Sequence, residues 1–305
     1  MMRPIGAFLA ALLSAPALVR AQTIPKDFVY DVKHGALDIL TVWASPFHGS
    51  LHKYEVAVAS LGVVALSSLE DDNVAAWVRG HPNAGAFKLI EPWRERSGLS
   101  FVNSGSGAWH PKGALAVYTI GLFVRSPAIR DLGMGCLSAS EAHAAVRTVV
   151  YATVARERPL FSEPVNGVQV ERPGNPYDFK VPGSSNWFGN SFFSGHVTSI
   201  TSCVTFINTR FHLGYVEPVL WAFDAGLALG RVADQRHYTS DILLGALLGY
   251  SIGKLVGERS LKRAERKAND ASSGPRRNAP EYSWTDGVYV SRLGEATLIG
   301  WKTPR

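Results

Sequence analysis

The stretch SASEAHAAVRTVVYATVA, residues 138–155, indicates the fold class of this chain. It opens with Ser-x-Ser-Glu, which is typical of a helix start because hydroxyl and carboxylate groups can bond the first free N–H groups. No glycine or proline interrupts the residues that follow. The stretch therefore predicts a long helix over 138–155.

Apolar segments of similar length lie on both sides of this stretch, separated by polar joints with glycine and proline. Alternating β-branched and aromatic residues, which are typical of strands, are scarce before residue 280. We therefore predict an all-α protein, a compact helical bundle over residues 22–258 with its motif-bearing core at 141–256. The other predicted helices are 56–69, 73–78, 112–124, 197–209, 216–230 and 240–256.

The N-terminus has the composition of an export signal. Arg3 precedes an apolar stretch over 5–19, and small residues precede Gln22, as at a signal-peptide cleavage site. We therefore expect residues 1–21 to be a signal peptide and the mature protein to be periplasmic or associated with the cell envelope. No later segment has the ~18 consecutive apolar residues typical of a membrane span. This favours a bundle in water with peripheral membrane contact; an integral inner-membrane protein is the alternative.

The composition changes twice towards the C-terminus. Residues 259–281 hold much of the excess behind the net charge of +6 and predict a basic flexible linker. They have no interleaved aromatic residues for stacking bases, so we expect no nucleic-acid partner. Residues 288–290 and 296–299 have the pattern of two short strands around Gly294, so we expect 282–305 to be a short β-hairpin-like tail.

Two cysteines, Cys136 and Cys203, allow two interpretations. An exported protein can pair them in a disulfide, whereas buried free thiols behave as small apolar side chains. We favour free thiols. Neither cysteine has a metal-ligand neighbour at a useful spacing, so we expect no zinc site.

Near the end of the predicted bundle, Arg231 precedes His237 and Asp241. On a helix, residues four apart share one face. A carboxylate bonded to one ring nitrogen fixes the imidazole tautomer and leaves the other nitrogen as a nucleophile. An exposed surface pair is the alternative.

Two further blocks hold groups that suit a phosphate. Ser194 and Gly195 precede the predicted helix 197–209, whose free N–H groups and positive dipole end attract anions, and His196 can act as a general acid. An ordinary serine cap is the alternative. In Arg156-Glu157-Arg158-Pro159, the fork of Arg158 matches two phosphate oxygens, and Pro159 ends the preceding helix.

Taken together, the blocks resemble the type 2 phosphatidic acid phosphatase superfamily, the group of acid phosphatases and vanadium haloperoxidases. That family shows Lys-x6-Arg-Pro, then Pro-Ser-Gly-His, then Ser-Arg-x5-His-x3-Asp. This chain has Arg158-Pro159, then Ser194-Gly195-His196, then Arg231-x5-His237-x3-Asp241.

The resemblance implies a role for each matching residue. His237 would be the nucleophile that forms a phosphohistidine, Asp241 would orient it, and His196 would act as acid and then as base. The phosphoryl oxygens would be held by Arg158, Arg231, Ser194 and the Gly195 amide.

Three positions depart from the family pattern. Tyr151 stands where the family has its lysine and cannot supply a cation. Arg147, one turn earlier on the same face, or Arg156 can replace that charge, and our hypothesis is Arg147. Phe193 replaces the proline before Ser194, and Gly230 replaces the serine before Arg231.

The resemblance implies a metal-independent phosphatase that needs no cofactor. Its substrates would be phosphate monoesters, either lipid phosphates, isoprenoid diphosphates or small soluble esters. A vanadate-dependent haloperoxidase is one alternative, and a degenerate binding or structural protein on the same scaffold is another. We interpret Glu70-Asp71-Asp72 as a helix-end turn in water and His143, like the other remaining histidines, as a surface or packing residue. The sequence does not indicate an oligomeric state.

Overall fold

The computed structural model describes residues 24–82, 84–90, 109–166, 168–180, 190–273, 284–285, 288–293 and 296–301. The predicted signal peptide over 1–21 lies outside these residues. Helices dominate the described part of the chain, so the predicted all-α class is confirmed.

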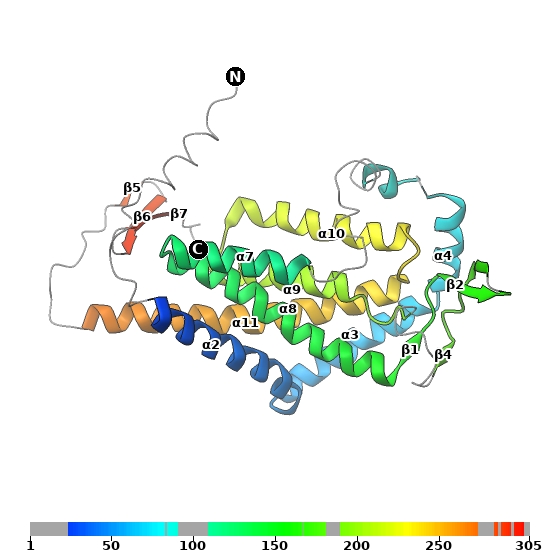
Figure 1. The fold of residues 1–305 in the computed structure, drawn as a ribbon, viewed down its shortest axis with the longest axis horizontal. Coiled ribbons are helices and arrows are strands. Elements are labelled where there is room, and N and C mark those ends of the chain that lie inside the picture. Colours follow the sequence, from blue (N-terminus) through cyan, green and yellow to red (C-terminus); the bar gives the residue numbers. More distant parts are fainter. Residues whose placement is uncertain are drawn as a thin grey trace, which may run out of the picture.

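Long helices lying side by side form the body of the molecule (Figure 1). Helix α11 packs most extensively on α9, α7 packs on α8, and α8 and α10 both pack on α9. All these helices were predicted from the apolar pattern. Their bounds are α7 (Trp109–Phe123), α8 (Pro127–Thr153), α9 (Gly195–Phe211), α10 (Glu217–Ala233) and α11 (Thr239–Ser273).

The predicted start of α8 at residue 138 is wrong. The helix begins at Pro127, and the hydroxyl of Ser126 accepts a hydrogen bond from the Ile129 N–H at 3.3 Å. Proline suits the first helical position because its missing N–H would have no partner there. Ser138 and Ser140, which resembled a cap, are buried within the helix.

Three more helices surround one end and one side of this body. They are α2 (Ile24–Ala44), α3 (Leu51–Ser68) and α4 (Asp71–Gly80), and short 3-10 turns follow α2 and precede α10 at Ser45–Phe47 and Gly214–Val216. Helix α3 and helix α4 were predicted, whereas α2 was not. Helix α4 lies at the end of the bundle where α11 begins (Figure 1).

Glycines spaced four residues apart along one face of α11 let it approach α9 closely. A Cβ atom on Gly249 would lie 2.6 Å from the Thr198 carbonyl oxygen, and one on Gly253 would lie 2.2 Å from the Ser202 carbonyl oxygen. Both distances are shorter than any real contact, so larger residues would push the helices apart. This close packing aligns the two helices and brings their N-terminal ends together.

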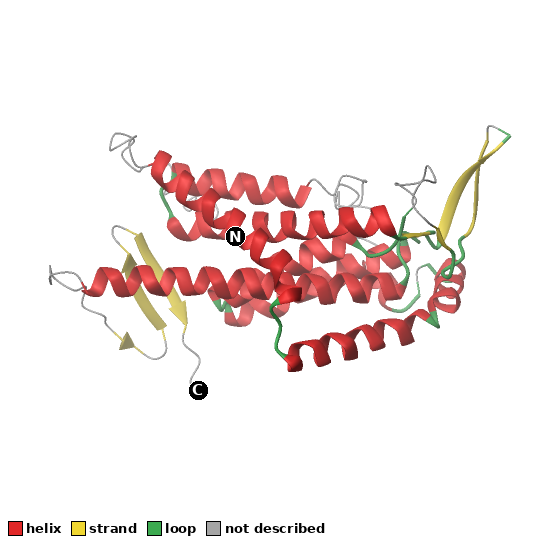
Figure 2. Ribbon diagram, turned by 90° about the horizontal axis from the view of Figure 1, so that it is seen from below, coloured by secondary structure: helices red, strands yellow, loops and turns green. Residues whose placement is uncertain are grey.

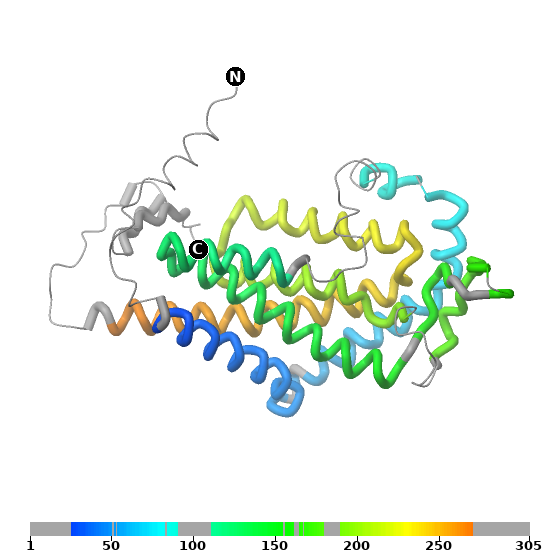
Figure 3. The backbone as a smooth tube through the Cα atoms, in the orientation of Figure 1, coloured from blue at the N-terminus to red at the C-terminus, as the bar shows by residue number. Residues whose placement is uncertain are grey.

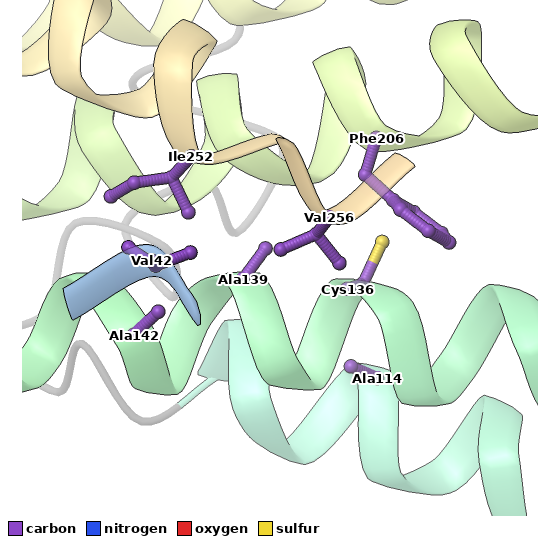
Figure 4. Packing of buried hydrophobic residues seen from close by; sticks show 8 residues of the cluster. All are labelled: Val42, Ala114, Cys136, Ala139, Ala142, Phe206, Ile252 and Val256. Atoms are coloured by element: carbon purple, nitrogen blue, oxygen red, sulfur yellow. The ribbon is translucent and has the colours of Figure 1, made fainter. Parts of the chain in front are cut away.

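The main apolar core lies where α8, α9 and α11 meet, with α2 against its edge (Figure 4). Within it the expectation of two free thiols is wrong, because Cys136 and Cys203 form a disulfide that joins α8 to α9. Their Cα atoms are 4.6 Å apart, which is within bridging distance. The buried members of this core are Val42, Ala114, Cys136, Ala139, Ala142, Phe206, Ile252 and Val256.

A group of charged residues, here called the distal cluster, fixes α2 to the far half of α11. The buried carboxylate of Asp38 accepts hydrogen bonds from Arg259 at 2.6 Å and from Arg263 at 2.7 and 2.8 Å. These pairs correct the predicted flexible linker over 259–281 in its first part, residues 259–273, whereas 274–281 lie outside the described residues. Residues 259–273 continue α11, which runs as one rod past the end of α2 (Figure 3).

The segment after α8 contains strands that the sequence pattern did not predict. Strands β2 (Leu160–Val165) and β3 (Val168–Pro173) form an antiparallel hairpin that projects from the end of the bundle (Figure 2). Strands β1 (Ala155–Arg156) and β4 (Phe179–Lys180) also pair. The predicted strand pattern of the tail is confirmed and extended, because β5 (Trp284–Thr285), β6 (Val288–Leu293) and β7 (Ala296–Trp301) form an antiparallel sheet.

Many apolar side chains are exposed on the outer helices. Along α3 they occur on several faces rather than on one stripe, and α2, α7 and α10 carry more of them. Exposed apolar surface of this extent indicates contact with a membrane or a partner, which counts against a bundle that meets only water. The exposed members on α3 are Tyr54, Val56, Val58, Leu61, Val63 and Leu66.

One described helix is long and apolar enough to cross a membrane, over Thr239–Asp270. Half of its apolar window is buried inside the protein, as in the core helix of a soluble bundle. The length and composition of this helix therefore do not by themselves indicate a membrane span.

Candidate active site

The three sequence blocks meet at the end of the bundle where α9 and α11 begin. The Ser194 N–H donates to the Asp241 carbonyl oxygen at 3.1 Å, which joins the second block to the third. Ser191 connects all three, because its N–H donates to the Arg156 carbonyl oxygen at 2.8 Å and its own carbonyl oxygen lies 2.7 Å from Nδ1 of His237. Sequence reasoning missed Ser191, whose contribution is made largely by its backbone.

His237 occupies the turn before α11, not the helix itself. The predicted bond to Asp241 is therefore wrong, because a residue before the first helical turn does not share a helix face with a residue four positions later. Its Nδ1 faces the carbonyl oxygen of Ser191 instead. A carbonyl only accepts, so Nδ1 carries the proton and Nε2 keeps its lone pair.

His237 is also buried, with 4% of its surface exposed. Burial, reinforced by the positive charges of Arg231 and Arg158, holds the pKa of the imidazole well below its ordinary value. The ring is therefore neutral at physiological pH, the form in which it can attack an electrophile.

Asp241 belongs to a buried group, here called the site cluster, made of Asp71, Arg156, Ser240 and Asp241. Its carboxylate accepts hydrogen bonds from Arg156 at 2.7 Å and from the Tyr238 N–H at 2.9 Å. Burial lowers the pKa of the Arg156 guanidinium, but the carboxylates of Asp241 and Asp71 outweigh it and raise that pKa above its usual value. Arg156 thus holds Asp241 and does not supply a cation for a substrate.

Two other arginines are placed to bind an anion. Arg158 is half-buried and Arg231 is 5% exposed. Burial lowers the pKa of both, that of Arg231 to about 10. The charge of Arg236 lowers both pKa values further, and the charge of Arg158 also lowers that of Arg231. Both remain protonated at neutral pH, and an anion between them would relieve their repulsion.

Two donors at this point have no hydrogen-bond partner among the described residues. They are Nε of Arg158 and the hydroxyl of Ser194, which is fully buried. Buried donors normally find partners. Their lack of a protein partner here fits a site that donates to the oxygens of a bound anion.

The position of the family lysine is occupied by a tyrosine that bonds within the protein. The Tyr151 hydroxyl donates to the Phe193 carbonyl oxygen at 3.3 Å, and burial raises its pKa. Arg147 lies against Gly195, since a Cβ atom there would be 2.8 Å from its Nη1 atom. The Arg147 guanidinium therefore lies at the start of α9, and its replacement of the family lysine stays a prediction.

The two remaining imidazoles of this region lie beside the same turn. His196 is half-buried in the first turn of α9. His143 is buried on α8, and its Nε2 atom would lie 3.4 Å from a Cβ on Gly195. The start of α9 therefore has a guanidinium and two imidazoles around it.

Sequence reasoning also missed the contribution of α4. Asp71, interpreted as part of a turn in water, is 1% exposed and receives hydrogen bonds from Arg156 and Ser240. At the other end of α4, Arg79 donates to the Pro159 carbonyl oxygen and the Gln235 side chain, both at 3.2 Å. These contacts link residues far apart in sequence, so no local pattern indicated them.

Residues 139–263 match the PAP2 superfamily. The PAP2 segment begins within α8 and ends within α11, so it contains all three blocks and leaves out α2, α3, α4 and α7.

A lipid A 1-phosphatase from Porphyromonas gingivalis is similar to a shorter segment. The two proteins are 35% identical over 72 residues, which are 22% of this chain and 15% of that protein. The alignment therefore covers well under two thirds of the relative. No solved structure matches the chain. Among the residues that the structure describes, no group of histidine, cysteine and acidic side chains is arranged to hold a metal ion.

Proposed function

We propose that the protein is a phosphatase that hydrolyses phosphate monoesters through a phosphohistidine on His237. The observation that carries the proposal is the buried, neutral imidazole whose Nδ1 is fixed by the Ser191 carbonyl oxygen. It stands next to the charges of Arg158 and Arg231. The PAP2 segment and the named activity of the P. gingivalis relative support this assignment.

In the first step, Nε2 of His237 attacks phosphorus while the bond from phosphorus to the ester oxygen breaks. His196 gives its proton to the leaving oxygen. Arg158, Arg231, the Ser194 hydroxyl and the Gly195 N–H hold the three other oxygens, whose negative charge the guanidiniums balance. Arg147 adds a cation at the start of α9, in place of the missing lysine.

In the second step, water attacks the phosphohistidine. The nitrogen–phosphorus bond breaks, His196 takes the proton of the water, and inorganic phosphate leaves. His237 is then neutral again with its proton on Nδ1. The mechanism uses groups of the protein and water, and it requires no cofactor.

We propose a lipid phosphate as the substrate class. The relative is named for lipid A, and the apolar side chains exposed on α2 and α3 suit a protein that meets a lipid surface. The disulfide between Cys136 and Cys203 supports an oxidising compartment and thus export to the cell envelope.

The test is phosphate release by the purified full chain in detergent. The panel contains phosphatidic acid, lipid A 1-phosphate, an isoprenoid diphosphate and p-nitrophenyl phosphate. We expect the highest kcat/KM for a lipid monoester, and a phosphoenzyme that is labile in acid and stable in alkali. Preference for the soluble ester would contradict the lipid assignment alone.

Two histidine variants make the test specific. His237→Ala should abolish phosphate release and phosphoenzyme. His52→Ala is the matched control, because His52 is exposed on α3 and pairs with Glu55. Full activity in His237→Ala would contradict the proposed mechanism.

A further inference from the structure

We propose that Asp71 of α4 is a positioning residue for catalysis, acting through Arg156 and Ser240 on the turn that carries His237. This inference rests on the proposed phosphatase function. It adds a helix that lies outside the PAP2 segment, which begins at residue 139.

Asp71 belongs to α4 but caps the start of α11. The Ser240 N–H, which belongs to the first turn of α11, donates to Oδ1 of Asp71 at 3.0 Å. The Ser240 hydroxyl also donates to Oδ2 of Asp71. The first N–H groups of a helix have no partner within it, so a carboxylate there stabilises the helix start and opposes the dipole.

Arg156 bonds both Asp71 and Asp241, so it connects this cap to Asp241. Its guanidinium donates to Asp71 at 2.7 Å, to Asp241 at 2.7 Å and to the Ser240 hydroxyl at 2.9 Å. Its Nε donates to the Pro176 carbonyl oxygen at 2.7 Å, so the planar fork is held in one orientation. Arg156 and Asp71 are 2% and 1% exposed, which excludes water as a substitute partner.

The site cluster contacts Tyr238, the residue next to the nucleophile His237. The Asp241 carboxylate accepts the Tyr238 N–H at 2.9 Å, and Tyr238 directly follows His237. The Arg156 guanidinium also lies over the Tyr238 ring, 4.4 Å from its centre. Asp71 therefore restrains the residue next to His237 through one intermediate arginine.

This arrangement separates positioning from phosphate binding. The Asp71 carboxylate is bonded to Arg156 and Ser240, so the oxyanion donors Arg158, Arg231 and Ser194 would keep their places when Asp71 is changed. A displaced imidazole slows its attack strongly, since about 1 Å of misplacement lowers rates by about 100-fold. We therefore expect a loss of rate rather than a loss of phosphate binding.

The experiment is rapid-quench measurement of phosphoenzyme formation in the full chain, for wild type, Asp71→Asn and the matched control Asp72→Asn. Asp72 is exposed beside Asp71 on the same helix. The amplitude counts competent molecules, whereas the rate constant reports the geometry in each of them. For Asp71→Asn we expect a rate constant lower by about 10- to 100-fold and a Ki for inorganic phosphate within about threefold of wild type, the change expected of an untouched binding site. The Asp72→Asn control should match wild type in both the rate constant and the Ki for inorganic phosphate.

The outcomes separate the two proposals. A reduced amplitude with an unchanged rate constant would show that Asp71 only supports folding and would overturn the inference. No phosphoenzyme in wild type would contradict the proposed function, and this inference with it. If Asp71→Asn does not fold, Ser240→Ala replaces it, since it removes one hydroxyl from the cluster, and the same slowed rate constant is expected.

Discussion

Two charge clusters hold other elements on α11, one at its start and one in its far half, and they are built in opposite ways. The site cluster has one guanidinium between two carboxylates, whereas the distal cluster has one carboxylate between two guanidiniums. About 20 helical residues separate them along α11, which is roughly 30 Å. Side chains of the site cluster are at most 2% exposed, but those of Arg259 and Arg263 are 34% and 22% exposed.

This difference in burial indicates different roles. A partly exposed cluster exchanges some of its bonds for water when it is disturbed, so it acts mainly on stability. A buried cluster leaves unpaired charge when one member is removed, and its other members must move. The site cluster lies beside His237, so that movement reaches the reacting atoms.

The largest effect is expected from Arg156→Met, which breaks the site cluster. Two buried carboxylates lose the guanidinium that bridges them, so the free energy of unfolding should fall by about 3–5 kcal/mol. Phosphate release should become undetectable. Chemical denaturation and the phosphatase assay on the folded fraction measure the two effects. An active Arg156→Met protein would show that the cluster does not position the site.

The disulfide provides the next comparison, because it joins α8 to α9 away from both clusters. The loop it closes spans 67 residues, so its loss should lower the free energy of unfolding by about 3–4 kcal/mol. The double variant Cys136→Ser with Cys203→Ser measures this by denaturation. Since the bond touches no site residue, kcat at 25 °C should not change; a fall in kcat for the folded protein would link the core to the site.

Much of this architecture follows from local sequence, and much does not. The apolar runs over 197–209 and 240–256 predict α9 and α11, because their helical period depends only on neighbouring residues. The strands over 160–173 were missed because their pairing competes with a proline- and glycine-rich composition typical of loops. Helix α11 continues beyond residue 258 because Arg259 and Arg263 find Asp38, more than 220 residues away.

The candidate site, too, was predicted from local sequence only in part. The motif spacing indicated that Arg158, His196 and Arg231 belong together with His237. It also led to the wrong partner for His237, since a backbone carbonyl carries no residue identity that a pattern could reveal. Asp71 was taken for a solvated turn, because an acidic run looks the same in sequence whether or not a distant arginine buries it.

A smaller effect is expected from Asp38→Asn in the distal cluster. Two arginines lose their shared carboxylate, but water reaches both of them, so the free energy of unfolding should fall by about 2 kcal/mol. Phosphoenzyme formation should keep its wild-type rate constant. Thermal unfolding and rapid quench together test this, and a slowed rate constant would remove the contrast between the two clusters.

The smallest effect concerns a buried carboxylate outside both clusters, for which no arginine or lysine partner is found among the described residues. Asp224 on α10 bonds the Thr201 hydroxyl at 2.8 Å, and burial raises its pKa to about 6. In the unfolded chain its pKa is about 4. The folded protein therefore holds this proton more tightly, so ionising Asp224 above pH 6 lowers stability, and the penalty disappears as the pH falls towards 4.

Asp224→Asn removes that ionisation and sharpens the comparison between paired and unpaired carboxylates. Allowing for partial solvation of the group, the variant should be about 1 kcal/mol more stable than wild type at pH 8. At pH 4 the difference should be small, because Asp224 is protonated in nearly all folded wild-type molecules and in about half of the unfolded ones. Thermal unfolding across this range is the measurement. A stability difference that does not change with pH would mean that Asp224 is ionised in the folded protein from pH 4 to pH 8. A carboxylate could then be buried here without the guanidiniums that the two clusters provide.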